Sequence, residues 1–408
     1  MTPNSSSTRP GFSEFVVLIA LIISLAALSI DAMLPALPEI ASGLRFEDAN
    51  DAQFVISILF VGMGFGQIVF GPLSDSIGRK PAINIGFIIF ILGCLLSIFA
   101  QDFEDMMIGR FLQGFGAAGP RIVSIALVRD CYAGRQMARV MSFVMTFFIL
   151  VPIIAPSIGQ LIVIYSTWHS IFVLFLVLSV VAMVWFSLRQ PETLPKDRRI
   201  RFSPRQMMRD IKMICTIPSA VGYTITMGLI FGAFIGYLSS AQQILQTQYA
   251  LGNLFAIYFG VLAASIGMAS LVNAHLVMRF GMRRLSRAAM FITALLSVPF
   301  FLLAQYYQGN PPLAMLMTYL LCVFFFFGIM FGNLNAMAME PLGHIAGLGS
   351  AVVGSVSTLM SVMLGIIVAD AYDGTVLPLV TGFSVLSILA LITMYWTGKF
   401  SSEVIVSP

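Results

Sequence analysis

Long apolar runs alternate with short polar segments along the chain. The length that crosses the ~30 Å hydrocarbon core of a bilayer as a helix is about 20 residues. Runs of that length or more lie near residues 15–40, 50–73, 81–100, 105–128, 137–164, 168–188, 217–245, 253–277, 286–307, 312–338, 346–370 and 376–397. The pattern therefore predicts an all-α membrane protein with twelve transmembrane helices.

One long polar segment interrupts this alternation. Residues 189–216 separate the first six apolar runs from the last six. This predicts an N-terminal six-helix half at 1–188, a cytoplasmic linker at 189–216 and a C-terminal six-helix half at 217–408. Within the linker, Ser-Pro at 203–204 begins a stretch rich in arginine, lysine and methionine. That stretch fits a short amphipathic helix on the membrane surface as well as it fits a solvated connector.

Composition places the whole chain in lipid. Of its 408 residues, 59% are hydrophobic and 10% are charged, and the mean hydropathy is +0.95. These values are far too apolar for a soluble globular protein. The first 13 residues are polar, and the apolar run after them continues without a small-residue cleavage site. We therefore expect that run to be kept as the first span.

The residue types that usually build catalytic or metal sites are scattered. The four cysteines and three histidines lie far apart and lack metal-ligand spacing. The sequence contains neither a soluble catalytic region nor a phosphate-binding loop. We therefore expect a protein that is not an enzyme, that uses no metal, cofactor or ATP, and that binds no nucleic acid.

Basic residues are distributed unequally between alternate loops. If the N-terminus is cytoplasmic, the cytoplasmic loops and tails hold 19 of the 22 Lys and Arg residues, including Arg9 and Lys399. The opposite loops hold Arg45, and Arg110 and Arg121 fall within a span. Because cytoplasmic loops are enriched in Lys and Arg, this asymmetry predicts that both termini are cytoplasmic.

The polar turn between the second and third spans has the sequence GPLSDSIGRKP. Gly71 and Gly78 permit close helix contact and a tight turn. Asp75 is placed to complement a nearby helix N-terminus, while Arg79 and Lys80 offer partners to acids on neighbouring helix ends. A simpler interpretation is that the cations only set the orientation in the membrane.

This turn, G-x-L-x-D-x-x-G-R-K, resembles the cytoplasmic signature loop of the major facilitator superfamily. A weaker copy, with a glycine and basic residues but without the acid, occurs at 278–284. Six plus six spans with such a turn in each half match the repeat plan of that superfamily. The resemblance implies a substrate cavity between the two halves at mid-membrane.

The first span contains a single acid in an apolar surrounding, in the sequence LSIDAMLPALPEIA. An unpaired charge costs several kcal/mol in the membrane interior, so Asp31 is expected to face a cavity and to exchange a proton. Pro35 and Pro38 should disrupt the helix beyond it and free backbone groups near the acid. The alternatives are that Asp31 lies at the membrane interface or is a static ion-pair partner.

The fourth span carries two arginines on one face. Arg110 and Arg121 are 11 residues apart, which is three helical turns plus about 20°. We predict that Arg110 and Asp31 couple transport to protons by interacting directly or through Gln113, so that protonation releases the pair. Asp31, Gln113 and Arg121 are also candidate substrate contacts, although Arg121 fits a packing or vestibule role equally well.

The segment from Arg110 to Gly114, R-x-x-Q-G, resembles the span-four motif of the superfamily that is associated with proton transfer. The Arg129-Asp130 pair extends this match. The resemblance implies that Asp130 pairs with Arg79 and joins Asp75 in a charge network that rearranges between access states.

The fifth span, VPIIAPSIGQL, resembles the antiporter motif of that span in part. Pro152, Pro156 and Gly159 match it, and they are expected to kink the span and allow close packing. Other residues stand at 151, 155 and 160, where the motif has glycine, so the inference of exchange rather than symport is weakened.

Taken together, these motifs look like the bicyclomycin-resistance branch of the drug:proton antiporters, with the close matches at 30–160. The resemblance implies a monomer in the bacterial inner membrane that exports small amphipathic molecules or drugs by alternating access, in exchange for protons. A dedicated exporter of a metabolite, amino acid or siderophore, and a proton symporter, remain alternatives. In the C-terminal half, the candidate substrate contacts are Tyr237, Gln242, Asn333 and Asn335, each of which could instead pack between helices.

Overall fold

The computed structural model describes residues 10–46, 48–200 and 203–401. Over these residues the regular structure is helical throughout, and twelve segments are long and apolar enough to cross a membrane. The predicted fold class, with its twelve spans, is confirmed. Arg9 and Arg201, two of the cations counted in the cytoplasmic loops, lie outside the described residues.

The N-terminal half contains seven helices and two short turns of 3₁₀-helix. They are α1 (Phe12–Asp31), η1 (Leu34–Ala36), α2 (Leu37–Gly43), η2 (Ala49–Gln53), α3 (Phe54–Ile77), α4 (Arg79–Ile98), α5 (Phe103–Cys131), α6 (Gly134–Tyr165) and α7 (His169–Arg189). Within this half, α5 packs against both α3 and α4, and α1 packs against α5, α6 and α7.

The linker and the C-terminal half follow. They contain η3 (Lys196–Arg198), α8 (Pro204–Cys215), α9 (Pro218–Gln242), a π-helical turn η4 (Gln243–Gln248), η5 (Gly252–Leu254), α10 (Phe255–Phe280), α11 (Met282–Tyr306), α12 (Leu313–Met339), η6 (Glu340–Ile345), α13 (Ala346–Asp370) and α14 (Leu377–Ser401). The linker therefore does contain a short helix, α8, in which Met208 and Arg209 are exposed.

The most extensive contacts between the halves are those of α3 with α13 and of α6 with α10. Small residues let these helices approach closely. A Cβ atom on Gly64 of α3 would lie 2.7 Å from the Leu359 side chain of α13, and one on Gly267 of α10 would lie 2.5 Å from the Ile149 side chain of α6. In the first of these pairs Gly71, predicted to permit close contact, lies against Ala351.

Proline has different effects in the first and fifth spans. The first span breaks after Asp31, with Pro35 in η1 and Pro38 at the start of α2, so the predicted disruption is confirmed. In contrast, α6 runs as one continuous helix through Pro152 and Pro156.

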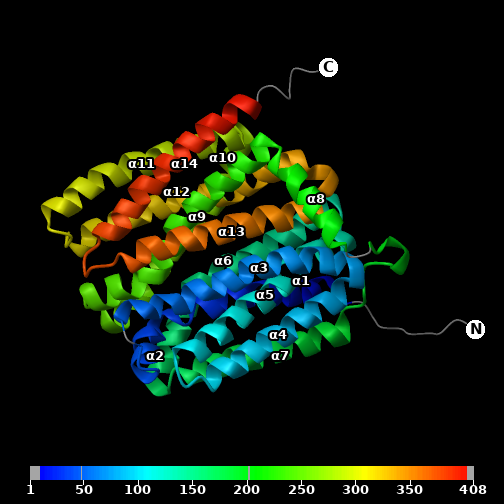
Figure 1. The fold of residues 1–408 in the computed structure, drawn as a ribbon, viewed down its shortest axis with the longest axis horizontal. Coiled ribbons are helices and arrows are strands. Elements are labelled where there is room, and N and C mark those ends of the chain that lie inside the picture. Colours follow the sequence, from blue (N-terminus) through cyan, green and yellow to red (C-terminus); the bar gives the residue numbers. More distant parts are fainter. Residues whose placement is uncertain (1–9, 47, 201–202, 402–408) are drawn as a thin grey trace, which may run out of the picture.

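Both ends of the described chain and α8 lie at one end of the helical bundle, here named the termini end (Figure 1). At the opposite end, here named the distal end, lie α2 and the loops that follow it (Figure 1). Asp31 therefore ends a helix that begins at the termini end and points toward the distal end.

Candidate functional site

A charge network occupies the turn between α3 and α4 at the termini end. The Arg79 guanidinium donates to Asp75 Oδ1 at 2.5 Å and to Asp130 Oδ2 at 3.0 Å. The predicted ion pairs of Arg79 with both acids are therefore present. The second oxygen of Asp75 lies 3.5 Å from the point where a Cβ on Gly347 would stand. That point is in the first turn of α13, where a negative charge is favourable, so the network reaches the opposite half.

The sequence did not predict one member of this region, Glu192 in the linker. Its two carboxylate oxygens accept hydrogen bonds from the backbone N–H groups of Arg79, at 3.0 Å, and Lys80, at 3.1 Å. They thereby cap the first turn of α4. Gly78 has a φ of 113°, and a Cβ there would overlap the Glu192 carboxylate. Nothing in the sequence distinguishes Glu192 from an ordinary linker acid.

Lys80 does not pair with a described acid of a neighbouring helix end, contrary to what the sequence led us to expect. Its ammonium donates to the Ser187 carbonyl near the C-terminus of α7, at 2.7 Å, and it is in none of the ion pairs among the described residues. The last carbonyls of a helix attract a cation, so Lys80 has a partner that a search for acids overlooks.

Arg110 is fully buried and does not contact Asp31. Its guanidinium donates to the carbonyls of Val55, at 2.9 Å, and Ser29, at 3.1 Å, and to the Gln113 side-chain oxygen at 2.6 Å. The Gln113 amide in turn donates to Ser97 Oγ at 3.2 Å. The predicted interaction of Asp31 with Arg110, direct or through Gln113, is therefore wrong for this conformation.

The break in α1 explains why the Arg110 guanidinium bonds the Ser29 carbonyl. The Ser29 carbonyl would bond the N–H group of Met33 in a continuous helix, but α1 ends at Asp31, so this carbonyl is available to the guanidinium. Ser29 and Asp31 are two residues apart, which is about 200° around a helix. Arg110 and the Asp31 carboxylate consequently lie on different sides of α1.

Asp31 is 5% exposed. It belongs to none of the ion pairs among the described residues, and no described group donates a hydrogen bond to it. The helix α9 of the opposite half, which carries Tyr237, packs against η1, the turn that follows Asp31. The structure thus places an acid without a cation in the interior of the bundle.

Arg121 lies toward the termini end on the same face of α5 as Arg110. Its guanidinium touches Met63 Sδ of α3 at 3.0 Å, and it too is absent from the ion pairs of the described chain. Exposure along this face falls from 41% at Ile125 to zero at Arg110. Along the Asp31 face of α1 it falls from 44% at Val17 to 5% at Asp31. Both faces are therefore more exposed toward the termini end than around Asp31 and Arg110.

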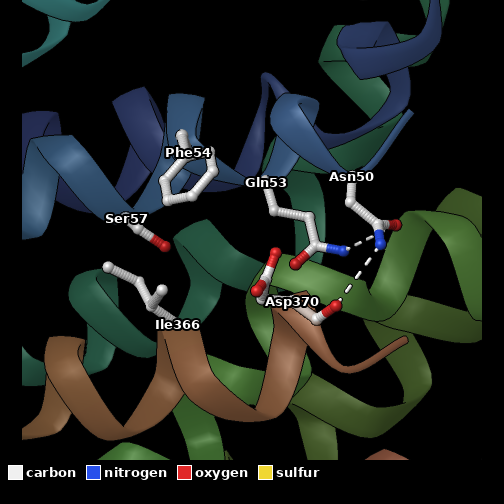
Figure 2. A pocket seen from close by; sticks show the side chains of 6 residues that line it. All are labelled: Asn50, Gln53, Phe54, Ser57, Ile366 and Asp370. Carbon is white, nitrogen blue, oxygen red and sulfur yellow. Dashed lines mark hydrogen bonds between the residues drawn. The ribbon is translucent and has the colours of Figure 1, made fainter. Parts of the chain in front are cut away.

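Three amide side chains bond one another at the distal end, Asn50, Gln53 and Gln243, here named the distal amide cluster. Figure 2 shows two of them, Asn50 and Gln53, beside Asp370 of α13. Gln53 donates to Gln243 at 2.5 Å, and Gln243 donates to Asn50 at 2.9 Å. Asn50 also donates to the Tyr372 carbonyl beyond α13, at 3.2 Å. Because Asn50 and Gln53 belong to one half and Gln243 to the other, the cluster holds the halves together.

The cluster was not predicted, since amides in loops carry no recognisable motif. Its neighbour in sequence, the candidate Gln242, makes a local hydrogen bond to Thr247 at 3.4 Å instead of a contact between halves. A second polar contact lies further inside, where the hydroxyls of Ser57 on α3 and Ser239 on α9 are 3.2 Å apart.

The remaining candidates occupy separate places. Asn333 and Asn273 exchange two hydrogen bonds, at 2.9 and 3.1 Å, while Asn335 is exposed. A Cβ on Gly159 would overlap the Ala32 carbonyl, so this glycine lets α6 approach the break in the first span. No cluster of metal-ligating side chains occurs in the described part of the chain.

Twelve helices of membrane-spanning length in the described chain define a multi-pass membrane protein. A model of the Major Facilitator Superfamily matches residues 19–365. The chain belongs to this superfamily, whose members are transporters of small molecules and not enzymes.

Three curated relatives illustrate the similarity. The chain is 31% identical to an uncharacterized MFS-type transporter, YdgK, of Bacillus subtilis over 86% of both sequences. It is 29% identical to a bicyclomycin resistance protein homolog of Haemophilus influenzae, covering 94% of this chain and 95% of that protein. It is 27% identical to multidrug resistance protein MdtL of Vibrio parahaemolyticus, covering 94% of this chain and 96% of that protein.

Solved structures share the fold. The human organic anion transporter MFSD10 matches with a TM-score of 0.69 at 15% identity, over 95% of this chain and 100% of that one. A D-xylose–proton symporter matches with a TM-score of 0.72 at 13% identity, over 93% and 97% of the two chains. At these identities the likeness concerns the fold alone.

Proposed function

We propose that this protein is a drug:proton antiporter, which exports small amphipathic molecules by alternating access. It would act as a monomer in the bacterial inner membrane, with both termini in the cytoplasm. The observation that carries the proposal is Asp31, a buried acid with no cation beside it at the break of the first span. The similarity to a bicyclomycin resistance protein homolog and to a multidrug resistance protein supports the class of cargo.

The geometry supplies a sequence of events. With the termini in the cytoplasm, the conformation described here receives cargo from the cytoplasm, because the distal amide cluster closes the other end. An unpaired carboxylate is costly in the membrane interior, so the buried state of Asp31 favours a bound proton. Opening of the distal end lets cargo leave and external protons reach Asp31, and closing it returns the proton to the cytoplasm.

Arg121 and the aromatic side chains of α9 and α12 are the proposed cargo contacts. The Phe231 and Phe331 rings are 4.4 Å apart, and Phe234 lies 5.6 Å from Phe331. All three are partly exposed. Such a surface accepts flat apolar groups of varied shape. Tyr237, Gln242, Asn333 and Asn335 stay predictions as substrate contacts, and the pairing of Asn333 with Asn273 favours a packing role for Asn333.

Everted membrane vesicles with an acidic lumen test the direction of coupling. Radiolabelled bicyclomycin and a panel of amphipathic drugs would be offered outside, in vesicles with and without this protein. Antiport predicts accumulation inside that collapses when an ionophore removes the pH gradient. A symporter would instead expel the compound under the same gradient. Transport of every compound at a rate that ignores the gradient would contradict proton coupling.

A further inference from the structure

The hydroxyl of Tyr237 is buried without a hydrogen-bond partner. The residue is 2% exposed, and its hydroxyl oxygen is among the buried side-chain atoms that have no partner in the described chain. An unsatisfied buried hydroxyl destabilises a fold. Its ring is fixed by aromatic neighbours of its own half, with Phe324 at 4.7 Å and Phe259 at 5.9 Å between ring centroids. The hydroxyl is therefore held in place with its hydrogen-bonding capacity unused.

Asp31, in the other half, is a second buried polar group. The helix that carries Tyr237, α9, packs against η1, the turn that directly follows Asp31. Asp31 is itself buried, and no described group donates a hydrogen bond to it. Two buried polar groups without hydrogen-bond partners among the described residues, one from each half, thus lie on or beside elements that pack together at the break of the first span.

Other titratable groups do not compete for Asp31. On α5, Arg110 directs its guanidinium to the Ser29 and Val55 carbonyls and to Gln113. Around Gly159, whose Cβ position would meet Ala32, α6 has no ionisable side chain between residues 149 and 163. The helix α7, which also packs on α1, carries ionisable side chains only at its ends, His169 and Arg189. Tyr237 is the one ionisable residue of α9 between 224 and 242.

We propose that the Tyr237 hydroxyl is the hydrogen-bond donor that recognises the ionised form of Asp31 and so links the charge of the first span to the position of the C-terminal half. This inference rests on the proposed function and assigns the element that senses the proton. An ionised carboxylate accepts a charge-assisted hydrogen bond from the hydroxyl, whereas a protonated carboxyl group accepts a weaker one. The two groups are not bonded in the conformation described here, so the bond forms when Asp31 loses its proton and draws α9 toward α1.

Tyr237 is a positioning residue in this scheme, and the proton itself is the probe. Infrared difference spectroscopy of the purified full-length protein, titrated with acid, reports the carbonyl stretch of protonated carboxyl groups. Asp31→Asn identifies the band of Asp31. Tyr237→Phe removes only the hydroxyl and keeps the ring contacts, so we expect the variant to fold. Without the donor, the Asp31 carboxyl group holds its proton more tightly. The midpoint of its infrared titration should therefore move to higher pH by about one unit.

Tyr223→Phe is the matched control. Tyr223 is also a buried tyrosine of α9, 1% exposed, but it lies about four turns away toward the termini end. Its substitution should leave the midpoint unchanged. An unchanged midpoint in Tyr237→Phe, or an equal shift in Tyr223→Phe, overturns the inference.

Two measurements distinguish a failure of the proposed antiport from a failure of the role proposed for Tyr237. If Asp31→Asn keeps full proton-driven accumulation in everted vesicles, the proposed antiport is wrong. If Asp31→Asn loses it while Tyr237→Phe titrates like the wild type, antiport stands and only the role of Tyr237 is rejected.

Discussion

The two ends of the bundle join the halves by different chemistry. At the termini end, Arg79 holds two carboxylates, and one of them extends to the first turn of α13. At the distal end, the neutral amides of Asn50, Gln53 and Gln243 bond one another across the same pair of halves. Charged groups are costly to strip of their partners, whereas amides can exchange their bonds with water. We infer that the distal end is built to open readily and that the termini end is built to hold one arrangement firmly.

The largest expected effect lies between the two ends, at Asp31. Asp31→Asn keeps the shape but cannot exchange a proton, so pH-driven accumulation in vesicles should fall to the level of vesicles without the protein. Exchange of labelled for unlabelled compound without a gradient should persist, because both closures remain intact. Glu104→Gln, which changes an exposed acid in the first turn of α5, is the control and should transport normally. Accumulation that survives Asp31→Asn would mean that another group carries the proton.

Arg79→Ala tests the termini end. It leaves Asp75 and Asp130 without their shared cation, and we expect a loss of about 2 kcal/mol in stability. This expected loss is smaller than that for a fully buried ion pair because the Asp75 side chain is 34% exposed. Thermal unfolding in detergent measures it, with Arg79→Lys recovering part of the loss.

Lys80→Ala is the comparison for this end. Its ammonium bonds only the Ser187 carbonyl among the described residues, so the substitution should cost less than about 1 kcal/mol. Equal losses at the two positions would show that the network adds nothing beyond a single cation in the turn.

Gln243→Leu tests the distal end. It removes the amide by which the C-terminal half bonds Gln53 and Asn50 of the other half. This should weaken the closed state by about 1.4 kcal/mol and raise distal opening about tenfold. A cysteine introduced at Ser57, which faces Ser239 inside the closure, reports opening through its rate of labelling by an impermeant thiol reagent from the distal side.

Gln242→Leu provides a control from the adjacent position. Gln242 bonds Thr247 within its own segment, so labelling at position 57 should stay near the wild-type rate. If both substitutions accelerate labelling equally, the cause is local unfolding of η4 and not the contact between the halves.

The smallest expected effect concerns alkaline pH at the distal end. Tyr249, just outside the seventh span, donates to the Pro311 carbonyl at 2.6 Å, and its burial together with Tyr372 raises the pKa of Tyr249 to about 12. A pKa raised in the folded state gives stability that is complete below the unfolded value of about 10 and is lost as the pH rises toward 12. Tyr249→Phe should remove this dependence, measured as the melting temperature between these pH values. A wild-type melting temperature that does not fall in this window would contradict it.

Parts of the site followed from the sequence because their partners are nearby or belong to a motif. The resemblance of the turn at 71–81 and of Arg129-Asp130 to superfamily motifs implied a charge network of Arg79 with Asp130 and Asp75, and both ion pairs are present. The prolines after Asp31 predicted the break in the first span, because proline removes a donor and clashes with the preceding turn. In contrast, the presence of an acid and an arginine in the first and fourth spans did not reveal that Arg110 bonds the Ser29 carbonyl and not Asp31.

The sequence by itself determined the twelve spans and the membrane environment. In a bilayer every backbone group must be bonded within its own helix, so length and hydropathy are sufficient to find the spans. The tertiary structure decided which polar groups meet. Glu192 caps a helix more than a hundred residues away, the distal amide cluster joins loops of both halves, and α9 packs against the turn that follows Asp31. Such contacts depend on how helices rotate and pack against each other, and the local pattern of one chain segment does not contain that information.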